Sequence, residues 1–290
     1  MKVSIIIPAL NEATCIADTV RAVLDNSYRD FELIVVDDGS YDETFSRLQS
    51  INDSRLVILK NQRSEGHGRA LNRGIGAATG KLVFLTDAHC LVRNDWIEQG
   101  VLSFSDPSVV AVEGDITYPF VPTSIRDKVP CNPFYHSFTR RISAPGRDYA
   151  SGNIAYRTET LRTLGGFNCE QFGSGRGDTE LGWRARALGT IVHNPKMIVE
   201  HAAEEWTWRS LIKNAARYEK DVLFFREQGF FFFRRGRILH PKLLCFPYLV
   251  WKYRRMPLRD FQMLPAFLAY LLLARIFIWR GAWRYGVFVL

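Results

Sequence analysis

The chain has 290 residues, 47% of them hydrophobic, which is enough to bury one large core or one core with an appendage. Its net charge of +8 is uneven, because residues 1–208 carry −4 and residues 209–290 carry +12. Five scattered cysteines with no C-x-x-C spacing exclude a disulfide-stapled framework and indicate a reducing compartment. The apolar run 3–7 is too short for a signal-peptide core, so we expect the N-terminal domain to stay in the cytosol.

Short apolar strands alternate with helical patterns over the first 90 residues. We predict strands at 3–7, 31–36, 56–59 and 82–85, and helices at 13–24, from Thr44 onward and at 68–78. Farther along, we predict a strand with a small-residue break at 149–156, a helix at 178–188 and a strand end at 198–201. This alternation is typical of βαβ units and indicates an α/β fold with a mostly parallel sheet covered by helices.

Asp87 and His89 directly follow the buried strand 82–85. Alternate residues of extended backbone point the same way, so both side chains are expected to face one site. Ligands of open α/β sheets bind at the carboxyl ends of the strands, and a carboxylate with an imidazole suits a cation such as Mn²⁺. The alternative is that Asp87 caps a turn and His89 is an ordinary loop residue.

Asp37 and Asp38 end another strand, where a carboxylate can accept hydrogen bonds from a ribose hydroxyl or a base N–H. The alternative is turn chemistry, since Asp-Gly-Ser is a good turn sequence. Gly66-His67-Gly68 precedes a helix and is a weak indication of a phosphate near the helix start.

Several motifs occur in a fixed order along the chain. They are Pro8 with Asn11-Glu12, Asp37-Asp38-Gly39-Ser40, Asn72-x-Gly74, the strand end at Asp87, Ser151-Gly152-Asn153, Gly165-Gly166-Phe167, Gly177-Asp178-Thr179-Glu180-Leu181 and His201. Together they resemble the family 2 glycosyltransferases of GT-A fold over about residues 3–205. The resemblance implies a Rossmann-like, mixed but mostly parallel sheet and transfer of a hexosyl or N-acetylhexosaminyl group from a nucleotide-sugar, with a UDP-sugar favoured.

The resemblance also implies roles for individual residues. Nucleotide binding is expected at Pro8, Asn11, Glu12, Asp37, Asp38, Arg69 and Asp87. A divalent metal, Mn²⁺ or Mg²⁺, is expected on Asp87, His89 and His201, and contacts to the acceptor or sugar at Gly152, Asn153 and Glu180. Asp178 is expected to be the catalytic base of an inverting transfer. Its alternative role is a helix cap, because it lies in the first turn of a predicted helix.

Two departures from the family pattern stand out. Where the family has D-x-D, this chain has Asp87-Ala88-His89, a D-x-H that resembles the retaining polypeptide N-acetylgalactosaminyltransferases. Where the family has E-D, this chain has Gly177-Asp178. A retaining enzyme of the D-x-H type is therefore the alternative mechanism. No Q-x-x-R-W follows, so the chain resembles single-addition enzymes. We interpret the remaining histidines as surface or packing residues: His67, His136, His193 and His240.

The C-terminal region, residues 206–290, is basic, aromatic and helical in pattern, whereas residues 1–205 form the predicted catalytic domain. Arginines among Trp and Phe suit helices in a membrane interface, and the apolar stretch 263–279 is at the lower limit for spanning. We expect the protein to lie at the cytoplasmic face of the cell membrane. Its expected acceptor is a hydroxyl of a glycan or of a lipid-linked molecule, and no nucleic-acid partner is expected. The proline-rich segment 119–147 is expected to be a lid or acceptor rim. Two further alternatives are simple packing of the C-terminal helices and a catalytically silent module that binds nucleotide or glycan.

Overall fold

The computed structural model describes residues 1–117, 129–130, 149–173, 176–202, 205–206, 212–213, 215–227, 233–234, 237–238 and 264–289. Two compact units divide the chain: residues 1–119 with 141–202, and residues 120–140 with 203–290. The predicted domain boundary is at residue 205. Most of the predicted lid, 119–147, and most of the basic aromatic segment, 228–263, lie outside the described residues.

An eight-stranded sheet forms the centre of the first unit, with the strand order β3-β2-β1-β4-β8-β6-β9-β5. The strands are β1 (Val3–Ala9), β2 (Phe31–Asp37), β3 (Leu56–Lys60), β4 (Leu82–Leu85), β5 (Cys90–Val92), β6 (Val109–Thr117), β8 (Ile154–Arg157) and β9 (Thr190–His201). The first four are mutually parallel, β8 is antiparallel to both of its neighbours, and β6 is parallel to β9. The predicted mixed, mostly parallel sheet is therefore confirmed.

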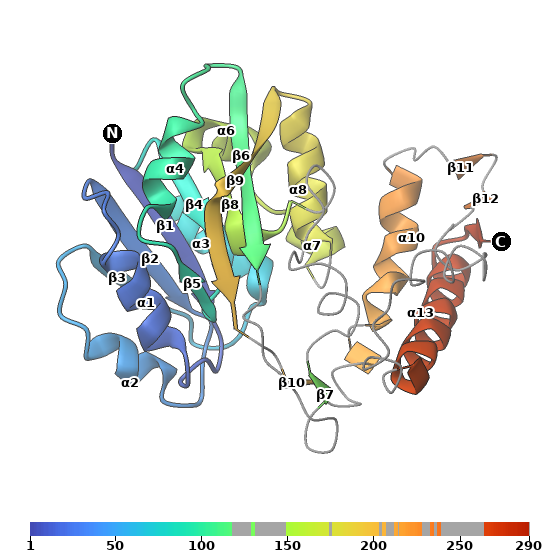
Figure 1. The fold of residues 1–290 in the computed structure, drawn as a ribbon. Helices are drawn as coiled ribbons and strands as arrows, with labels where there is room; N and C mark the ends of the chain where they lie inside the picture. Colours follow the sequence, from blue (N-terminus) through green and yellow to red (C-terminus); the bar gives the residue numbers. More distant parts are fainter. Residues whose placement is uncertain are drawn as a thin grey trace. The chain divides into compact units, whose positions relative to one another are not determined.

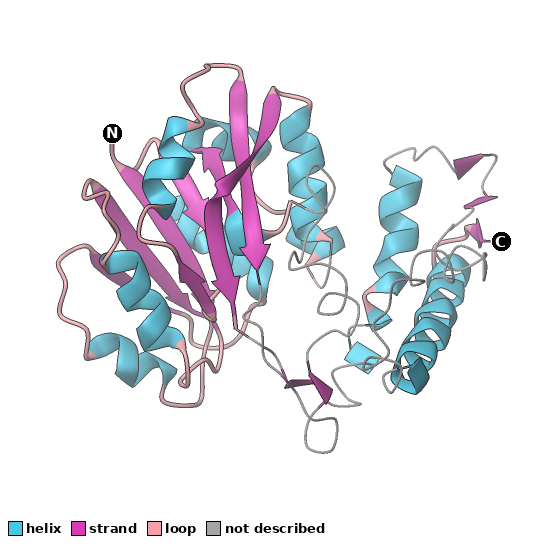
Figure 2. Ribbon diagram, viewed as in Figure 1, coloured by secondary structure: helices cyan, strands magenta, loops and turns pink. Residues whose placement is uncertain are grey.

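Helices cover both faces of this sheet (Figure 1, Figure 2). They are α1 (Ile16–Leu24), α2 (Thr44–Gln49), α3 (His67–Ala77), α4 (Trp96–Leu102), α6 (Thr158–Leu164), α7 (Cys169–Phe172) and α8 (Gly177–Arg186). Alternation along β1 sends Ile5 and Ile7 into one core with α1 and α4. Ile6 enters the other core with α3, α6 and α8. Full burial of β1 on both faces explains why its sequence is a continuous apolar run.

The predicted strands of the first 90 residues end within two residues of the observed ones, and α1 begins three residues later than predicted. The predicted strand 149–156 is wrong in its first half, because Ser151–Asn153 form a 3-10 turn and only Ile154–Arg157 is a strand. The region 90–117, with β5, α4 and β6, was not assigned from the sequence. Its strands reach the sheet through pairing with β8 and β9, which lie far away in the chain.

Asn153 joins three elements of the first unit. Its Oδ1 accepts a hydrogen bond from Trp96 Nε1 at 2.8 Å, and its Nδ2 donates to the carbonyls of Asp115 and Met197, both at 2.8 Å. Its side chain is only 1% exposed. The expected contact of Asn153 with acceptor or sugar does not fit this geometry, since the amide is already used to hold α4, β6 and β9 together.

We expect Asn153→Ala to lower the free energy of unfolding by about 3 kcal/mol, because it leaves a buried indole N–H and two carbonyls without their partner. Urea unfolding followed by tryptophan fluorescence measures the change. Asn94→Ala is the control, since this exposed asparagine makes one bond to the Asp25 carbonyl and should cost well under half as much. Equal losses in the two variants would contradict the role of Asn153 as a framework residue.

In the described part of the second unit, the helices α10 (Tyr218–Glu227) and α13 (Leu264–Arg284) pack against each other. Val222 and Ile278 share a small core, and Glu219 forms ion pairs with Arg280 and Arg284 at 3.4 and 3.0 Å. At Gly281 a Cβ atom would lie 2.4 Å from the Glu219 carbonyl oxygen, so only glycine permits this close approach.

The outer face of α13 carries an apolar stripe. Its members are Leu272, Ile276, Trp279 and Trp283, with exposed fractions of 63%, 45%, 52% and 88%. Their spacing of three to four residues puts them on one side of the helix. Pro265 lies in the first turn, where a missing N–H costs nothing. Among the helices of the described ranges, none combines the length and apolarity needed to cross a membrane.

Candidate active site

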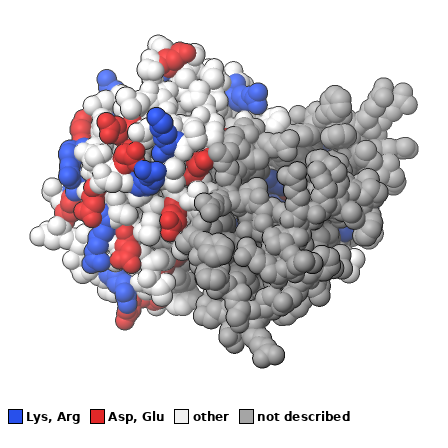
Figure 3. Space-filling view, viewed as in Figure 1, with Lys and Arg blue, Asp and Glu red and all other residues white. Residues whose placement is uncertain are grey.

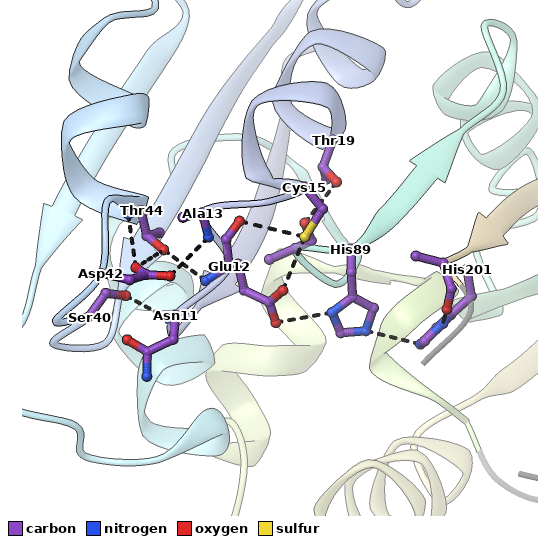
Figure 4. Close-up of polar contacts among 12 residues, drawn as sticks. Asn11, Glu12, Ala13, Cys15, Thr19, Ser40, Asp42, Thr44, His89 and His201 are labelled. Carbon is purple, nitrogen blue, oxygen red and sulfur yellow. Dashed lines mark hydrogen bonds and ion pairs between the residues drawn. The ribbon is translucent and has the colours of Figure 1, made fainter. Parts of the chain in front are cut away.

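The loop after β1 is tied to the loop after β2 by main-chain donors and side-chain acceptors (Figure 4). The bonds are Asn11 N to Ser40 Oγ (2.9 Å), Tyr41 N to Asn11 Oδ1 (3.0 Å), Glu12 N to Thr44 Oγ1 (2.7 Å) and Ala13 N to Asp42 Oδ2 (3.1 Å). Asn11 has a positive φ of 58°, a conformation that asparagine tolerates better than most residues. We call this set of bonds the loop clamp. The loop clamp fixes the backbone of Asn11 and Glu12 just after β1. It thereby directs the Glu12 side chain toward His89, which follows β4.

Asp38 organises the loop before α3. Its carboxylate accepts four hydrogen bonds, from Asn61 Nδ2, Ser64 Oγ and the backbone N–H groups of Glu65 and Gly66. Burial raises the pKa of Asp38, but these four bonds outweigh burial and leave the pKa below its ordinary value. The predicted direct contact of Asp38 with a nucleotide does not fit a carboxylate that is already saturated. Asp38 instead shapes the loop.

Asp37 differs from Asp38 in its bonding. One oxygen accepts from the Ser40 N–H at 3.0 Å, whereas the buried Oδ2 has no hydrogen-bond partner in the described part of the chain. In the pairing of β1 with β2, Ala9 lies opposite Asp37 and Pro8 lies opposite the preceding residue, Val36. Arg69, on the first turn of α3, forms an exposed ion pair with Glu170 at 2.6 Å. The predicted nucleotide residues thus come from the ends of β1, β2 and β4 and from the start of α3.

Four potential metal ligands meet where β4 ends and β9 ends: Asp87, His89, Cys90 and His201. One ligand atom from each lies within 4.8 Å of the others. Asp87 and His89 were expected to share a site with His201, and the structure brings all three together. Burial raises the pKa of the Cys90 thiol well above its ordinary value, and the Asp87 charge adds to the rise. The carboxylate and the two imidazoles are therefore the donors left for a divalent metal ion, and a mixed oxygen and nitrogen set suits Mn²⁺ better than Mg²⁺.

The two imidazoles face each other through their Nε2 atoms, 3.0 Å apart (Figure 4). His89 Nδ1 lies 3.1 Å from Glu12 Oε1, and His201 Nδ1 lies 2.7 Å from the Ala202 carbonyl oxygen. Both acceptors require an Nδ1–H donor, which leaves a lone pair on each Nε2 of a neutral ring. Two facing lone pairs at this distance need a shared proton or a cation between them. The donor set therefore fits a metal ion.

Glu12 supports His89 from behind. Burial raises the pKa of Glu12, but its interactions with His89 and the hydrogen bond from the Cys15 thiol outweigh burial and lower the pKa below its ordinary value. A carboxylate that accepts from the distal N–H of a metal-bound imidazole fixes its tautomer and raises its basicity. The structure places Glu12 next to the potential metal ligands, where it can orient His89, and its predicted role in nucleotide binding stays a prediction. The spacing of Asn11-Glu12 in the sequence contained no signal for this contact.

Gly152 lets Asp87 approach the backbone of the 3-10 turn. A Cβ at Gly152 would lie 2.9 Å from Asp87 Oδ2, so a larger residue would displace the carboxylate. The other oxygen, Oδ1, is buried without a hydrogen-bond partner among the described residues. A buried carboxylate oxygen without a donor is costly unless a cation compensates it. This observation also fits a metal ion at Asp87.

Asp178, in α8, contacts the same 3-10 turn through Ser151, the residue before Gly152. It is half-buried in the first turn of α8 and accepts hydrogen bonds from the backbone and side chain of Ser151. Burial raises the pKa of Asp178 and the Asp87 charge adds to this, while His67 and Ser151 partly oppose the rise. The nearby charges that act on this carboxyl belong to the metal-ligand cluster and to His67, which is unlike the surroundings of a simple helix cap.

Two sequence-based assignments change with these contacts. Glu180 forms a two-pronged ion pair with Arg184 at 2.6 and 2.7 Å, and Arg184 also donates to the carbonyls of Leu164 and Gly166. Glu180 is thus a framework residue, and its expected acceptor contact does not fit. His67, interpreted from sequence as a surface or packing residue, lies 3.1 Å from Ser151 Oγ and belongs to the site. His193 pairs with Asp115 at 2.7 Å, and His136 and His240 lie outside the described residues.

Comparison with known proteins identifies the family. The sequence pattern of the family described as glycosyl transferase family 2 matches residues 4–165, more than half of the chain. The chain belongs to glycosyl transferase family 2. The resemblance of its ordered motifs is therefore confirmed.

This family 2 member is similar to curated proteins over part of their length. It is 32% identical to glycosyltransferase AglE of Haloferax volcanii, over 57% of this chain and 55% of AglE. It is 36% identical to WfaP of Escherichia coli, named as a UDP-Glc:alpha-D-GlcNAc-diphosphoundecaprenol beta-1,3-glucosyltransferase, over 30% of this chain and 34% of WfaP. The chain thus matches between about a third and about half of the length of these relatives.

Solved structures confirm the GT-A fold of this family 2 member. A mannosyltransferase from Pyrobaculum calidifontis, in complex with GDP-Man and Mn²⁺, superposes with a TM-score of 0.63 at 18% identity, over 95% of this chain and 86% of that one. TarS of S. aureus with UDP-GlcNAc gives a TM-score of 0.57 at 16% identity, over 99% and 93%. At these identities the likeness concerns the fold alone.

We expect Glu12→Gln to weaken Mn²⁺ binding about 10- to 100-fold, the usual cost of losing a group that orients a metal ligand. Glutamine can still accept from His89 Nδ1, so the loss isolates the negative charge. Electron paramagnetic resonance of free Mn²⁺ measures the affinity without turnover. Glu43→Gln, at an exposed ion pair with Arg47, is the matched control and should bind as the unchanged protein does. Unchanged affinity in both Glu12→Gln and His89→Ala would place the metal elsewhere.

Proposed function

We propose that this protein is a metal-dependent, inverting glycosyltransferase that moves a sugar from a nucleotide-sugar to a hydroxyl acceptor at the cytosolic face of a membrane. The observation that carries the proposal is the half-buried Asp178, which the turn Ser151–Asn153 holds beside Asp87 and the two facing imidazoles. A carboxyl with a raised pKa next to a cation site suits general-base chemistry.

The donor nucleotide is proposed to lie across the loops that follow β1 and β2. The loop clamp holds Pro8 and Asn11 against the segment that contains Asp37, whose buried oxygen can accept from a base N–H or a ribose hydroxyl. Asp38 keeps the next loop in shape, and Arg69 lies at the start of α3. A UDP-sugar is the donor we favour, because the relative WfaP is named as a glucosyltransferase that uses UDP-Glc.

Asp87, His89 and His201 would hold the divalent metal, with Glu12 orienting His89. When bound, the metal supplies positive charge that offsets the charge developing on the leaving diphosphate. Asp178 takes the proton of the acceptor hydroxyl as its oxygen attacks the sugar carbon, and the diphosphate leaves with the bonding electron pair. Gly152 lets the Asp87 carboxylate lie against the turn that also holds Asp178. A glycan or lipid-linked hydroxyl is the proposed acceptor.

Inversion is favoured over retention because a base is present. One in-line displacement needs a proton acceptor on the side opposite the leaving group, and Asp178 is a carboxylate with a raised pKa. A retaining mechanism is the alternative, because the retaining enzymes that this chain resembles have the same D-x-H motif as Asp87-Ala88-His89. Product stereochemistry separates the two.

We expect Asp178→Asn to lower kcat by about 10²–10⁴, the typical contribution of a general base, with little change in donor affinity. In the unchanged enzyme kcat should fall as the pH drops through the raised pKa of Asp178, because the protonated carboxyl cannot accept a proton. NMR of the product from an α-linked UDP-sugar should show a β linkage. An α linkage, or nearly full kcat in the variant, would favour the retaining mechanism, and no transfer from any nucleotide-sugar would favour a silent binding module.

Membrane association is proposed for the second unit. The apolar stripe on α13 is flanked by Arg275 on one side and by Arg280 and Arg284, which pair with Glu219, on the other. The Arg275 guanidinium lies 5.0 Å from the centre of the Trp279 ring. Such a helix suits the interface of an anionic bilayer, with indole rings among headgroups and guanidinium groups near phosphates. By contrast, Figure 3 shows basic and acidic side chains interspersed over the described face of the first unit.

We expect the full-length protein to float with vesicles that contain phosphatidylglycerol, and salt to weaken the binding by screening. Replacing both Trp279 and Trp283 by Ser should reduce flotation, because it removes the largest exposed apolar groups of α13. Tyr41→Ser is the control, since this side chain is 90% exposed but lies on the first unit. Failure of the unchanged protein to bind anionic or zwitterionic vesicles would favour simple packing of the C-terminal helices.

A further inference from the structure

His67, Ser151 and Asp178 form a chain of hydrogen bonds between the start of α3 and the start of α8. His67 Nε2 lies 3.1 Å from Ser151 Oγ, and the Ser151 hydroxyl and N–H both bond to Asp178. Ser151 is buried, Asp178 is half-buried and His67 is exposed. The chain therefore leads from the proposed base to an imidazole that water can reach.

The loop that carries His67 is held in place by the framework. Gly66 has a φ of +98°, which suits glycine, and its N–H donates to Asp38. Gly68 packs against α7, since a Cβ there would lie 3.0 Å from Cys169 Sγ. Because the glycines on both sides of His67 are held in place, the backbone directs the His67 side chain toward Ser151. The contact therefore follows from the fold.

We propose that His67 acts through Ser151 as the positioning residue of Asp178 and as the exit for the proton that Asp178 takes from the acceptor. This inference rests on the proposed function, because it presupposes that Asp178 is the base. No contact of His67 with donor or acceptor is needed.

The proton balance closes without any other reactant. After transfer, Asp178 carries the acceptor proton as a neutral carboxyl. Asp178 gives this proton to Ser151 Oγ while the Ser151 hydroxyl proton passes to Nε2 of neutral His67, and the resulting imidazolium releases one proton to water. Asp178 returns to its ionised state, and the net result is one proton moved from the acceptor hydroxyl to solvent.

The charges around His67 are consistent with this role. Asp178 on α8 faces it through Ser151, and Arg69 on its own helix is paired with Glu170 of α7. Cys169 of α7 packs at the same helix start, and burial raises the pKa of its thiol. Asp87, after β4, acts on Asp178 with a sign opposite to that of His67. A protonated His67 thus favours the ionised base, and its removal should raise the pKa of Asp178.

Steady-state kinetics of the full chain with UDP-sugar, acceptor and Mn²⁺ test the proposal. We expect His67→Gln to lower kcat about tenfold, below the range for loss of the base itself, with unchanged KM for the donor. The acidic limb of the kcat profile should move to higher pH. His67→Ala should regain kcat when imidazole is added, and Ser151→Ala should not. The double variant of His67 and Ser151 should lose no more than the larger single loss, because both act in one chain.

His193→Gln is the matched control, since it removes an imidazole from another carboxylate, Asp115, and should leave the pH profile unchanged. A thermal melt of each variant checks folding. Loss of kcat in His67→Ala without imidazole rescue and without a shifted acidic limb would overturn the proposal, as would unchanged kcat. Full activity of Asp178→Asn would instead overturn the proposed function itself, so the two failures can be told apart.

Discussion

Asp87 and Asp178 repel each other across one tight turn, and the organisation of the site depends on how that repulsion is compensated. Ser151 holds one carboxyl and Gly152 touches the other, so the two charges approach through adjacent residues of the backbone. Like charges that share a partly buried site raise the pKa of one member of the pair. The surrounding groups fit this demand: a cation site of two imidazoles on the Asp87 side, and His67 on the Asp178 side.

Four acidic residues in and around the site fall into two groups according to their hydrogen bonds. Asp38 and Glu180 are saturated by donors or by an arginine, so they stabilise loops and have no capacity left for a ligand. Asp37 and Asp87 each keep one buried oxygen without a partner among the described residues. A buried acceptor that lacks a donor costs free energy of folding, and such a cost is expected where a ligand later supplies the missing contact.

Much of the fold could be predicted because β1, β2 and β4 are continuous apolar runs with polar residues directly after them. The convergence of Asp87, His89 and His201 followed from two strand ends and the family resemblance. Other parts could not be read from the sequence, because they depend on contacts between distant residues. Glu12 reaches His89 over 77 positions and His67 reaches Ser151 over 84, and neither spacing is a pattern. Asn153 and Glu180 matched family motifs, but only their hydrogen bonds reveal that they hold the framework.

The loop clamp has a consequence for the order in which the site is assembled. Its bonds join residues about 30 positions apart, whereas the two facing imidazoles are separated by 112. Closing a short loop costs less conformational entropy than closing a long one, and local contacts form faster. During synthesis the loops proposed to bind the donor can therefore take shape while the chain is still shorter than 100 residues, and His201 joins the potential metal ligands only after β9 has emerged and paired with β6. The growing protein would form the proposed nucleotide loops well before the proposed cation site is complete, which separates the two parts of the site in time.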